Sequence, residues 1–110
     1  MSEDSAVDPT PDDAPPDVVV TDNPAAHRFE VRVGGELAGL TTYVVADNRV
    51  IFTHAEVYPR HEGHGVGSTL ARAALDDVIA RGMLITPSCP FIRDFVQHHP
   101  SYQEHVAPPL

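Results

Sequence analysis

Three glycines alternate with other residues in the run Gly63-His64-Gly65-Val66-Gly67-Ser68. An apolar, β-branched stretch that ends at Val57 precedes this run, and an amphipathic stretch follows it as far as Arg81. Strand, glycine loop and helix in this order predict an anion site. Glycine lets the backbone approach a ligand closely, and the first N–H groups of a helix have no intrahelical acceptor. A glycine-rich turn without a ligand is the alternative interpretation.

Two familiar phosphate-binding loops do not fit this run. The loop of nucleotide hydrolases needs Gly-Lys-Ser/Thr after its last glycine, and the sequence contains no lysine. The dinucleotide motif G-x-G-x-x-G needs a third glycine where this chain has Ser68 or Leu70, depending on the glycine that begins it. The run is therefore a glycine loop of another type.

Charge and composition narrow the function classes. The 110 residues carry a formal net charge of −9, and most of it lies in residues 1–23, which hold seven acidic residues and no basic one. The rest of the chain is close to neutral and shows no basic stripe, which argues against a nucleic-acid partner. The sequence has no apolar run long enough for a membrane span. One cysteine, Cys89, excludes an intrachain disulfide, so we expect a cytoplasmic protein.

The composition predicts one folded domain behind a tail. Residues 1–25 are acidic and rich in proline and are expected to be disordered, although Val18-Val19-Val20 could add as an edge strand. The domain is expected over residues 26–107, with a short tail at 108–110.

Hydrophobic periodicity predicts a mixed α+β (α/β) fold. Alternating residues and a Gly34-Gly35-Glu36 turn indicate an antiparallel three-strand meander, which leads into the glycine loop. A helix and a parallel strand should follow, because a strand–helix–strand crossover of this length implies parallel pairing. We expect the helices to pack on the sheet. The expected elements are strands over residues 27–33, 37–45 and 49–57, a helix over 66–81, a strand over 83–86 and a short helix from Pro90.

Several motifs follow one another at consistent intervals: Thr53-His54-Ala55-Glu56-Val57, Glu62-Gly63-His64-Gly65-Val66-Gly67-Ser68, Ala73-Ala74-Leu75-Asp76, Cys89-Pro90-Phe91 and His99-Pro100-Ser101-Tyr102. Over roughly residues 27–106 the chain thereby resembles the small single-domain branch of the GNAT acetyltransferase superfamily. The resemblance implies a minimal GNAT fold and an N-acetyltransferase with acetyl-CoA as co-substrate and no metal. The acceptor would be a small-molecule or protein amine.

The same resemblance implies a cofactor site. Backbone N–H groups of the glycine loop would bind the pyrophosphate of CoA, and the strand before the loop would lie beside the pantetheine arm. The acetyl group would lie where that strand splays from the next one. Arg60 and Arg72 are candidates for the 3′-phosphate. The cofactor-binding residues are thus expected to be Val57, Arg60, Gly63, His64, Gly65, Val66, Gly67 and Ser68.

The chain departs from the superfamily pattern in two ways. The usual loop begins with Gln or Arg, where this chain has Glu62. The helices that normally lie between the first two strands and shape the acceptor pocket are absent from the sequence.

Acetyl transfer to an amine needs a base and a proton for the leaving thiolate. Glu56 or His54 could be the base, directly or through water, because both face one side of the strand before the loop. A salt bridge for Glu56 and a backbone-bonded half-buried ring for His54 are the alternatives. Cys89 could be a proton donor or a transient acetyl carrier, or a small buried packing residue. Tyr102 is a further candidate acid.

Other interpretations remain open at this point. Without acceptor-shaping helices, the chain could be a non-catalytic module or sensor that binds CoA or acetyl-CoA without turnover. An adaptor that uses the acidic tail is a third alternative. A metal site is disfavoured, because the remaining histidines lack the cysteines of structural zinc sites.

Overall fold

The computed structural model describes residues 17–108, so the tail predictions for residues 1–16 and 109–110 lie outside the described part. Within residues 17–108 the strands form one sheet of order β2-β3-β4-β5-β6. β2 to β5 are antiparallel, and β6 pairs parallel with β5, which confirms the mixed fold class and the meander. The strands are β2 Val18–Asn23, β3 Arg28–Val33, β4 Glu36–Ala46, β5 Arg49–Val57 and β6 Leu84–Pro87.

The edge strand β2 begins before the domain boundary expected at residue 25, inside the segment assigned to the disordered tail. It pairs with β3 along its whole length. The Tyr43 hydroxyl donates a hydrogen bond to Asp22 Oδ1 at 2.6 Å, and Arg81 pairs with Asp22 Oδ2 at 2.6 Å. These contacts with distant segments offset the chain entropy that the composition of the strand alone could not overcome.

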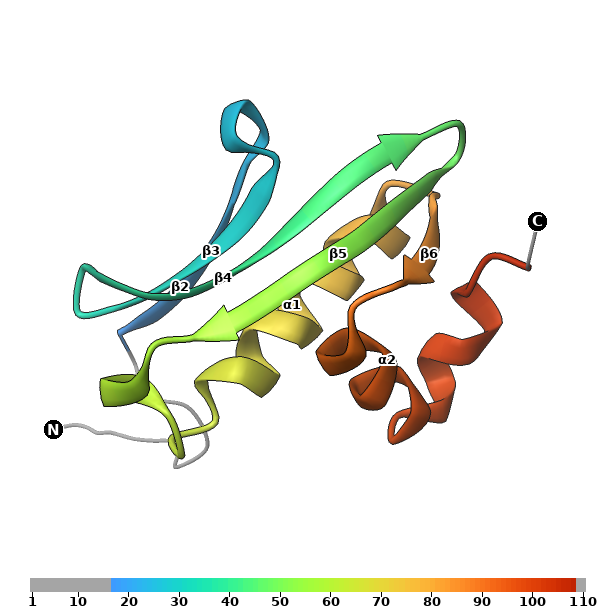
Figure 1. Cartoon of the computed structure of the whole chain (residues 1–110). Helices are drawn as coiled ribbons and strands as arrows, with labels where there is room; N and C mark the ends of the chain where they lie inside the picture. The colour runs from blue at the N-terminus through green and yellow to red at the C-terminus, as the bar shows by residue number, and fades with distance from the viewer. Residues whose placement is uncertain (1–16, 109–110) are drawn as a thin grey trace, which may run out of the picture.

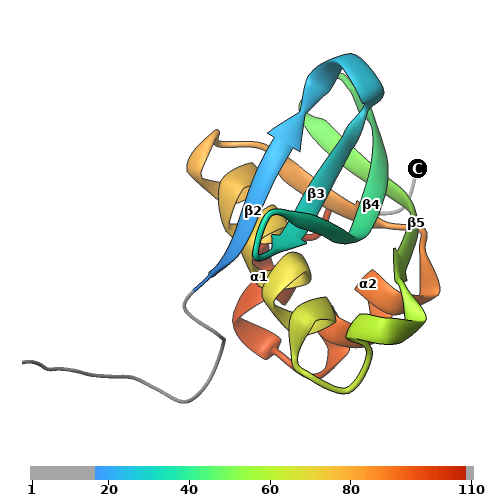
Figure 2. The same ribbon diagram turned by 90° about the vertical axis from the view of Figure 1, so that its left-hand side faces the viewer.

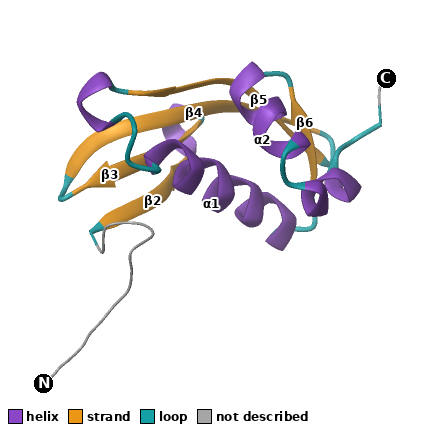
Figure 3. Ribbon diagram, turned by 90° about the horizontal axis from the view of Figure 1, so that it is seen from below, coloured by secondary structure: helices purple, strands orange, loops and turns teal. Residues whose placement is uncertain are grey.

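Two α-helices, α1 Val66–Ala80 and α2 Pro90–Gln97, lie on the same face of the sheet (Figure 1; Figure 3, seen from below). Gly82 ends α1 with a φ of 75°, and the N–H of Met83 donates to the Val78 carbonyl at 3.1 Å. This left-handed glycine cap satisfies a carbonyl of the last turn. The chain also forms the 3₁₀ helices η1 Pro24–Ala26, η2 Pro59–His61 and η3 Pro100–His105.

The hydrophobic core lies between the sheet and the two helices. α1 faces the sheet with an apolar stripe whose members recur at helical spacing, as the sequence predicts. The largest fully buried apolar side chains are Phe52, Leu70, Leu75, Ile85, Ile92, Val31, Val50 and Val78. Each such side chain stabilises the fold by roughly 1.5–3 kcal/mol. The opposite face of the sheet carries no α-helix within residues 17–108, as the end-on view of Figure 2 also shows.

β5 is irregular on both of its sides near its midpoint. Its pairing with β4 shifts by one residue, because Thr42 faces His54 whereas Tyr43 faces Phe52, so Thr53 is an extra residue. On the other side, parallel pairing with β6 ends where Phe52 faces Pro87. The N–H of Cys89 then donates to the Phe52 carbonyl at 2.9 Å. From Thr53 to Val57, β5 continues without β6 beside it, so the two strands part (Figure 1).

Candidate functional site

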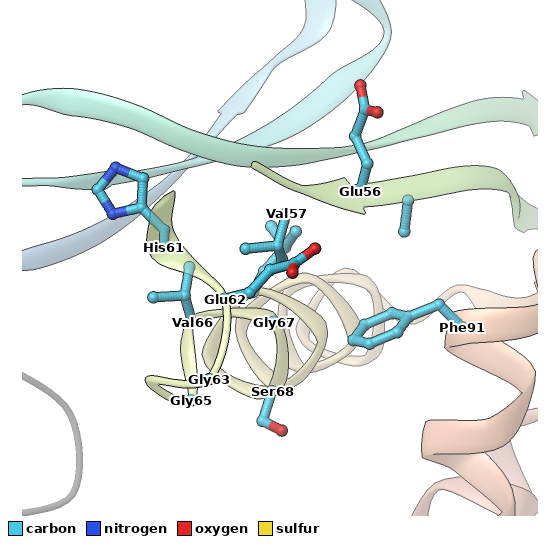
Figure 4. Close-up of a pocket in the computed structure, with 12 residues that line it drawn as sticks. Glu56, Val57, His61, Glu62, Gly63, Gly65, Val66, Gly67, Ser68 and Phe91 are labelled. Atoms are coloured by element: carbon cyan, nitrogen blue, oxygen red, sulfur yellow. The ribbon is translucent and has the colours of Figure 1, made fainter. Parts of the chain in front are cut away.

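A cleft of about 390 Å³ lies between the end of β5, the glycine loop with the start of α1, and α2. Figure 4 shows its walls: Val57 descends from β5 toward α1, and the Phe91 ring reaches toward α1 from α2. The cleft is lined by Ala55, Glu56, Val57, His61, Glu62, Gly63, Gly65, Val66, Gly67, Ser68, Leu70 and Phe91. The structure thus brings together most of the residues that the sequence assigned to cofactor binding.

The glycine loop leaves the start of α1 open. Gly63 and Gly65 have φ angles of 82° and 75°, which glycine adopts without strain. Gly65 is the N-cap, and no side chain caps the N–H groups of the first turn. The Thr69 hydroxyl donates instead to the Gly65 carbonyl at 2.9 Å. The first N–H groups of α1, those of residues 66–68, have no intrahelical acceptor and carry the positive end of the helix dipole. This geometry suits a phosphate oxygen.

The two arginines proposed for the 3′-phosphate, Arg60 and Arg72, contact other side chains in the structure. Arg60 donates a hydrogen bond to Glu36 Oε2 at 2.9 Å, and its side chain is 73% exposed. Arg72 lies over the Phe95 ring, 5.7 Å from its centroid. Neither arginine lines the cleft, and neither does His64. Glu62 does line it, so an anion at the start of α1 would meet backbone N–H groups rather than either of these arginines.

One histidine of the loop is more enclosed than its sequence context suggests. His61 lines the cleft, and its side chain is 13% exposed. Its Nε2 atom is buried, has no hydrogen-bond partner and lies 3.8 Å from Glu36 Oε1. Together with the Arg60 contact, this places η2 against the start of β4.

The two candidate bases lie on the side of β5 that faces away from the helices. In Figure 4 the Glu56 side chain extends from β5 in the direction opposite to Val57. Its carboxylate lies 3.8 Å from His54 Nε2, and the side chains of His54 and Glu56 are 61% and 48% exposed. An acceptor that approaches the open face of the sheet could therefore meet both groups, and Glu56 also lines the cleft.

The candidate acids lie deeper in the fold. Cys89 is 2% exposed, belongs to the hydrophobic core and does not line the cleft. Tyr102 is also buried, and its hydroxyl donates to Asp76 Oδ1 at 2.8 Å. Burial and this hydrogen bond raise the pKa of Tyr102 above its ordinary value of 10.0. A catalytic role for Cys89 or Tyr102 remains a prediction.

Sequence reasoning missed Phe91 and Leu70, which also line the cleft. Phe91 lies four residues before Phe95, a spacing that is typical of one helix face. Its side chain is 39% exposed, whereas Ile92, Phe95 and Val96 are buried. Ile92, Phe95 and Val96 already form a complete core-facing stripe on α2. Phe91 is therefore an apolar residue more than the core needs, and this was the sequence signal available for it.

The residues that the structure describes, 17–108, were also compared with the requirements of a metal site and of a membrane-spanning helix. Among them, no three His, Cys, Asp or Glu side chains gather in a way that could hold a metal ion. No helix in this part of the chain combines the length and the apolar character that crossing a bilayer would demand.

Comparison with known proteins connects this geometry to a family. The family model of GCN5-related N-acetyltransferases matches residues 28–105. The Gallus gallus protein NATD1 is 33% identical over 85 residues, which cover 74% of this chain and 77% of that protein. The Homo sapiens NATD1 is 32% identical over 85 residues, which cover 74% and 75%.

Solved structures show the same fold. A GCN5-like protein from Staphylococcus aureus superimposes with a TM-score of 0.64 at 21% identity, over 86% of this chain and 93% of that one. A ribosomal-protein-alanine N-acetyltransferase from Brucella melitensis biovar Abortus gives a TM-score of 0.53 at 19% identity, over 76% and 62%. The expected minimal GNAT fold is thereby confirmed.

Proposed function

The chain belongs to the GCN5-related N-acetyltransferase family and is an acyltransferase, and we propose that it transfers an acetyl group from acetyl-CoA directly to an amine. The observation that carries this proposal is the junction of two features in one cleft. The uncapped N–H groups of α1 lie at one end, and the stretch of β5 beyond Phe52, which no longer pairs with β6, forms a wall. CoA fits both, because its diphosphate is an anion and its arm is a long uncharged chain.

The proposed step is attack of a neutral amine on the thioester carbonyl. A C–N bond forms, the C–S bond breaks, the amine loses a proton and the thiolate gains one. Glu56 is the proposed base, directly or through a water, with His54 beside it to share the charge. The Glu56 side chain extends from β5 in the direction opposite to Val57, so the acceptor would reach it from the open face of the sheet, while CoA occupies the cleft that Glu56 also lines.

The acceptor is proposed to be a small-molecule or protein amine, and the place of action the cytoplasm. Cys89 is a free thiol, which is typical of a reducing compartment. β2 and β3, the first two strands of the described residues, are joined only by the short 3₁₀ helix η1, so no α-helix inserted between them closes the acceptor side. This openness also motivates the alternative of a CoA-binding module without turnover.

One experiment separates these possibilities. The purified protein is incubated with acetyl-CoA and a mixture of polyamines, amino acids and a lysine-containing peptide, and the products are analysed by mass spectrometry. A mass increase of one acetyl group on any amine supports the enzyme. Saturable CoA binding without product formation would support the binding module, and absence of CoA binding would contradict both.

A further inference from the structure

Phe91 is an aromatic side chain that the core does not use. It is the second residue of α2 and is 39% exposed, and it lies outside the hydrophobic core cluster. The core contacts of α2 come from Ile92, Phe95 and Val96. A large apolar ring in this position gains little folding free energy, because much of its surface stays in water. Its placement therefore points to another role.

Gly67, at the start of α1, has no side chain, and this lets the Phe91 ring lie against the helix backbone. A Cβ atom at Gly67 would lie 3.0 Å from Phe91 Cζ and 3.3 Å from Val57 Cγ2. Both distances are tighter than most Cβ contacts in proteins, so glycine at position 67 lets both neighbours approach the helix backbone without having to shift. In Figure 4 the ring and Val57 converge on Gly67 from two sides of the cleft.

The chemistry of the cleft changes along its length. At the loop, backbone N–H groups offer hydrogen bonds to an anion. Immediately beside them, Val57 and Phe91 present apolar surface. A ligand that complements this order carries a diphosphate and continues as an uncharged chain. A nucleotide that ends at its diphosphate would leave the apolar walls in contact with water.

On these grounds we infer that Phe91 is a specificity-determining residue, by which the cleft selects a diphosphate that carries an uncharged arm over the bare nucleotide. The inference rests on the proposed use of acetyl-CoA and adds to it a residue and a discrimination. The ring contacts the arm just beyond the diphosphate, so it contributes to binding of the CoA thioester and not to binding of the nucleotide part.

The test compares CoA with adenosine 3′-phosphate 5′-diphosphate, which has the same nucleotide and lacks the arm. Isothermal titration measures both Kd values for the full chain and for Phe91→Leu and Phe91→Ala. We expect Phe91→Ala to weaken CoA binding about tenfold, as removal of a partly buried ring should. The CoA Kd of Phe91→Leu should lie between those of the wild type and Phe91→Ala. The Kd of adenosine 3′-phosphate 5′-diphosphate should be the same for all three proteins.

Val44→Ala is the matched control, because Val44 is also an exposed apolar residue (50%) and does not line the cleft. It should change neither Kd. Equal weakening of both ligands in Phe91→Ala would overturn the inference, since the ring would then only support the loop. An unchanged CoA Kd would overturn it as well. A wild-type chain that binds neither ligand would instead overturn the proposed function on which the inference rests.

Discussion

The Phe91 ring occupies the space that a side chain at position 67 would need: its Cζ atom lies 3.0 Å from the position of a Cβ on Gly67. This contact joins the start of α1 to the start of α2 across the cleft. The two residues are 24 positions apart in the sequence, so the glycine of the loop and the aromatic residue of the second helix form one structural unit.

Gly67→Ala should therefore displace the Phe91 ring and weaken CoA binding about tenfold, the effect of losing one good apolar contact. Alanine favours helix over glycine by about 1 kcal/mol, so the variant should remain folded. In a Phe91→Ala background the same substitution should cost much less affinity, which titration of both single variants and the double variant will show. Strictly additive losses would contradict a direct contact as the cause.

Glu56→Gln should lower kcat about 100-fold, which is a typical contribution of a general base. The Kd of CoA should not change, because the Glu56 side chain extends away from the helix side of β5. Steady-state kinetics and titration measure the two quantities separately.

His54→Asn is the comparison variant, since the two side chains lie 3.8 Å apart. A larger kcat loss in His54→Asn than in Glu56→Gln would reverse the assigned roles. A similar loss of CoA affinity and kcat in Glu56→Gln would mean that the carboxylate is structural.

Tyr43→Phe tests the attachment of β2. Tyr43 is 5% exposed and its hydroxyl donates to Asp22 Oδ1 at 2.6 Å; burial, together with this contact, raises the pKa of Tyr43 to about 12. Removing the hydroxyl should lower the free energy of unfolding by about 1–2 kcal/mol, the usual cost of a lost buried hydrogen bond. Urea unfolding measures the change, and an unaltered free energy would show that β2 is held by backbone pairing alone.

The lowered pKa of Glu30 predicts how the stability of the protein depends on pH. Hydrogen bonds from Arg32, Asn23 and Arg28 lower the pKa of this buried carboxyl from its ordinary value of 4.5 to about 2. A lowered folded pKa stabilises the native state above the unfolded value, and this contribution is lost as the pH falls from about 4.5 toward 2.

The measurement compares the free energies of unfolding of wild type and Glu30→Gln between pH 7 and pH 2. The difference between them should shrink as the pH falls through this window, because the amide side chain of the variant cannot titrate. A constant difference would exclude Glu30 as the group responsible.

Local hydrophobic periodicity was enough to predict β5 and α1, the two elements on either side of the glycine loop. β5 and α1 were predicted almost residue by residue, because a β-branched run and a helical apolar stripe each carry a strong period. β2 was assigned to the tail with an edge strand at Val18-Val19-Val20 as the alternative, and this alternative is confirmed; its contacts with Tyr43 and Arg81 come from segments distant in the sequence. The extra residue Thr53 left no glycine or proline signal either, so the parting of β5 from β6 came from the family resemblance and not from the residues.

The structure brings most of the predicted loop residues to the cleft but places several of the predicted side chains elsewhere. The loop N–H groups follow from the order of strand, glycines and helix. The engagement of Arg60 by Glu36 is a tertiary property that no spacing encodes, whereas the burial of Cys89 agrees with the packing role given as its alternative. Phe91 was missed for a related reason: helical periodicity places it within reach of the core, and only the packed structure shows that Ile92 fills that place.

The central claim is that amide N–H groups at the start of α1 bind the diphosphate of CoA. A titration of the ¹⁵N-labelled chain with CoA, followed by two-dimensional NMR, tests it directly. The amide signals of Val66, Gly67 and Ser68 should move together and saturate with one Kd, while that of Val44, outside the cleft, should stay in place. Binding of CoA that leaves these three signals unmoved, or no binding at millimolar CoA, would contradict the claim.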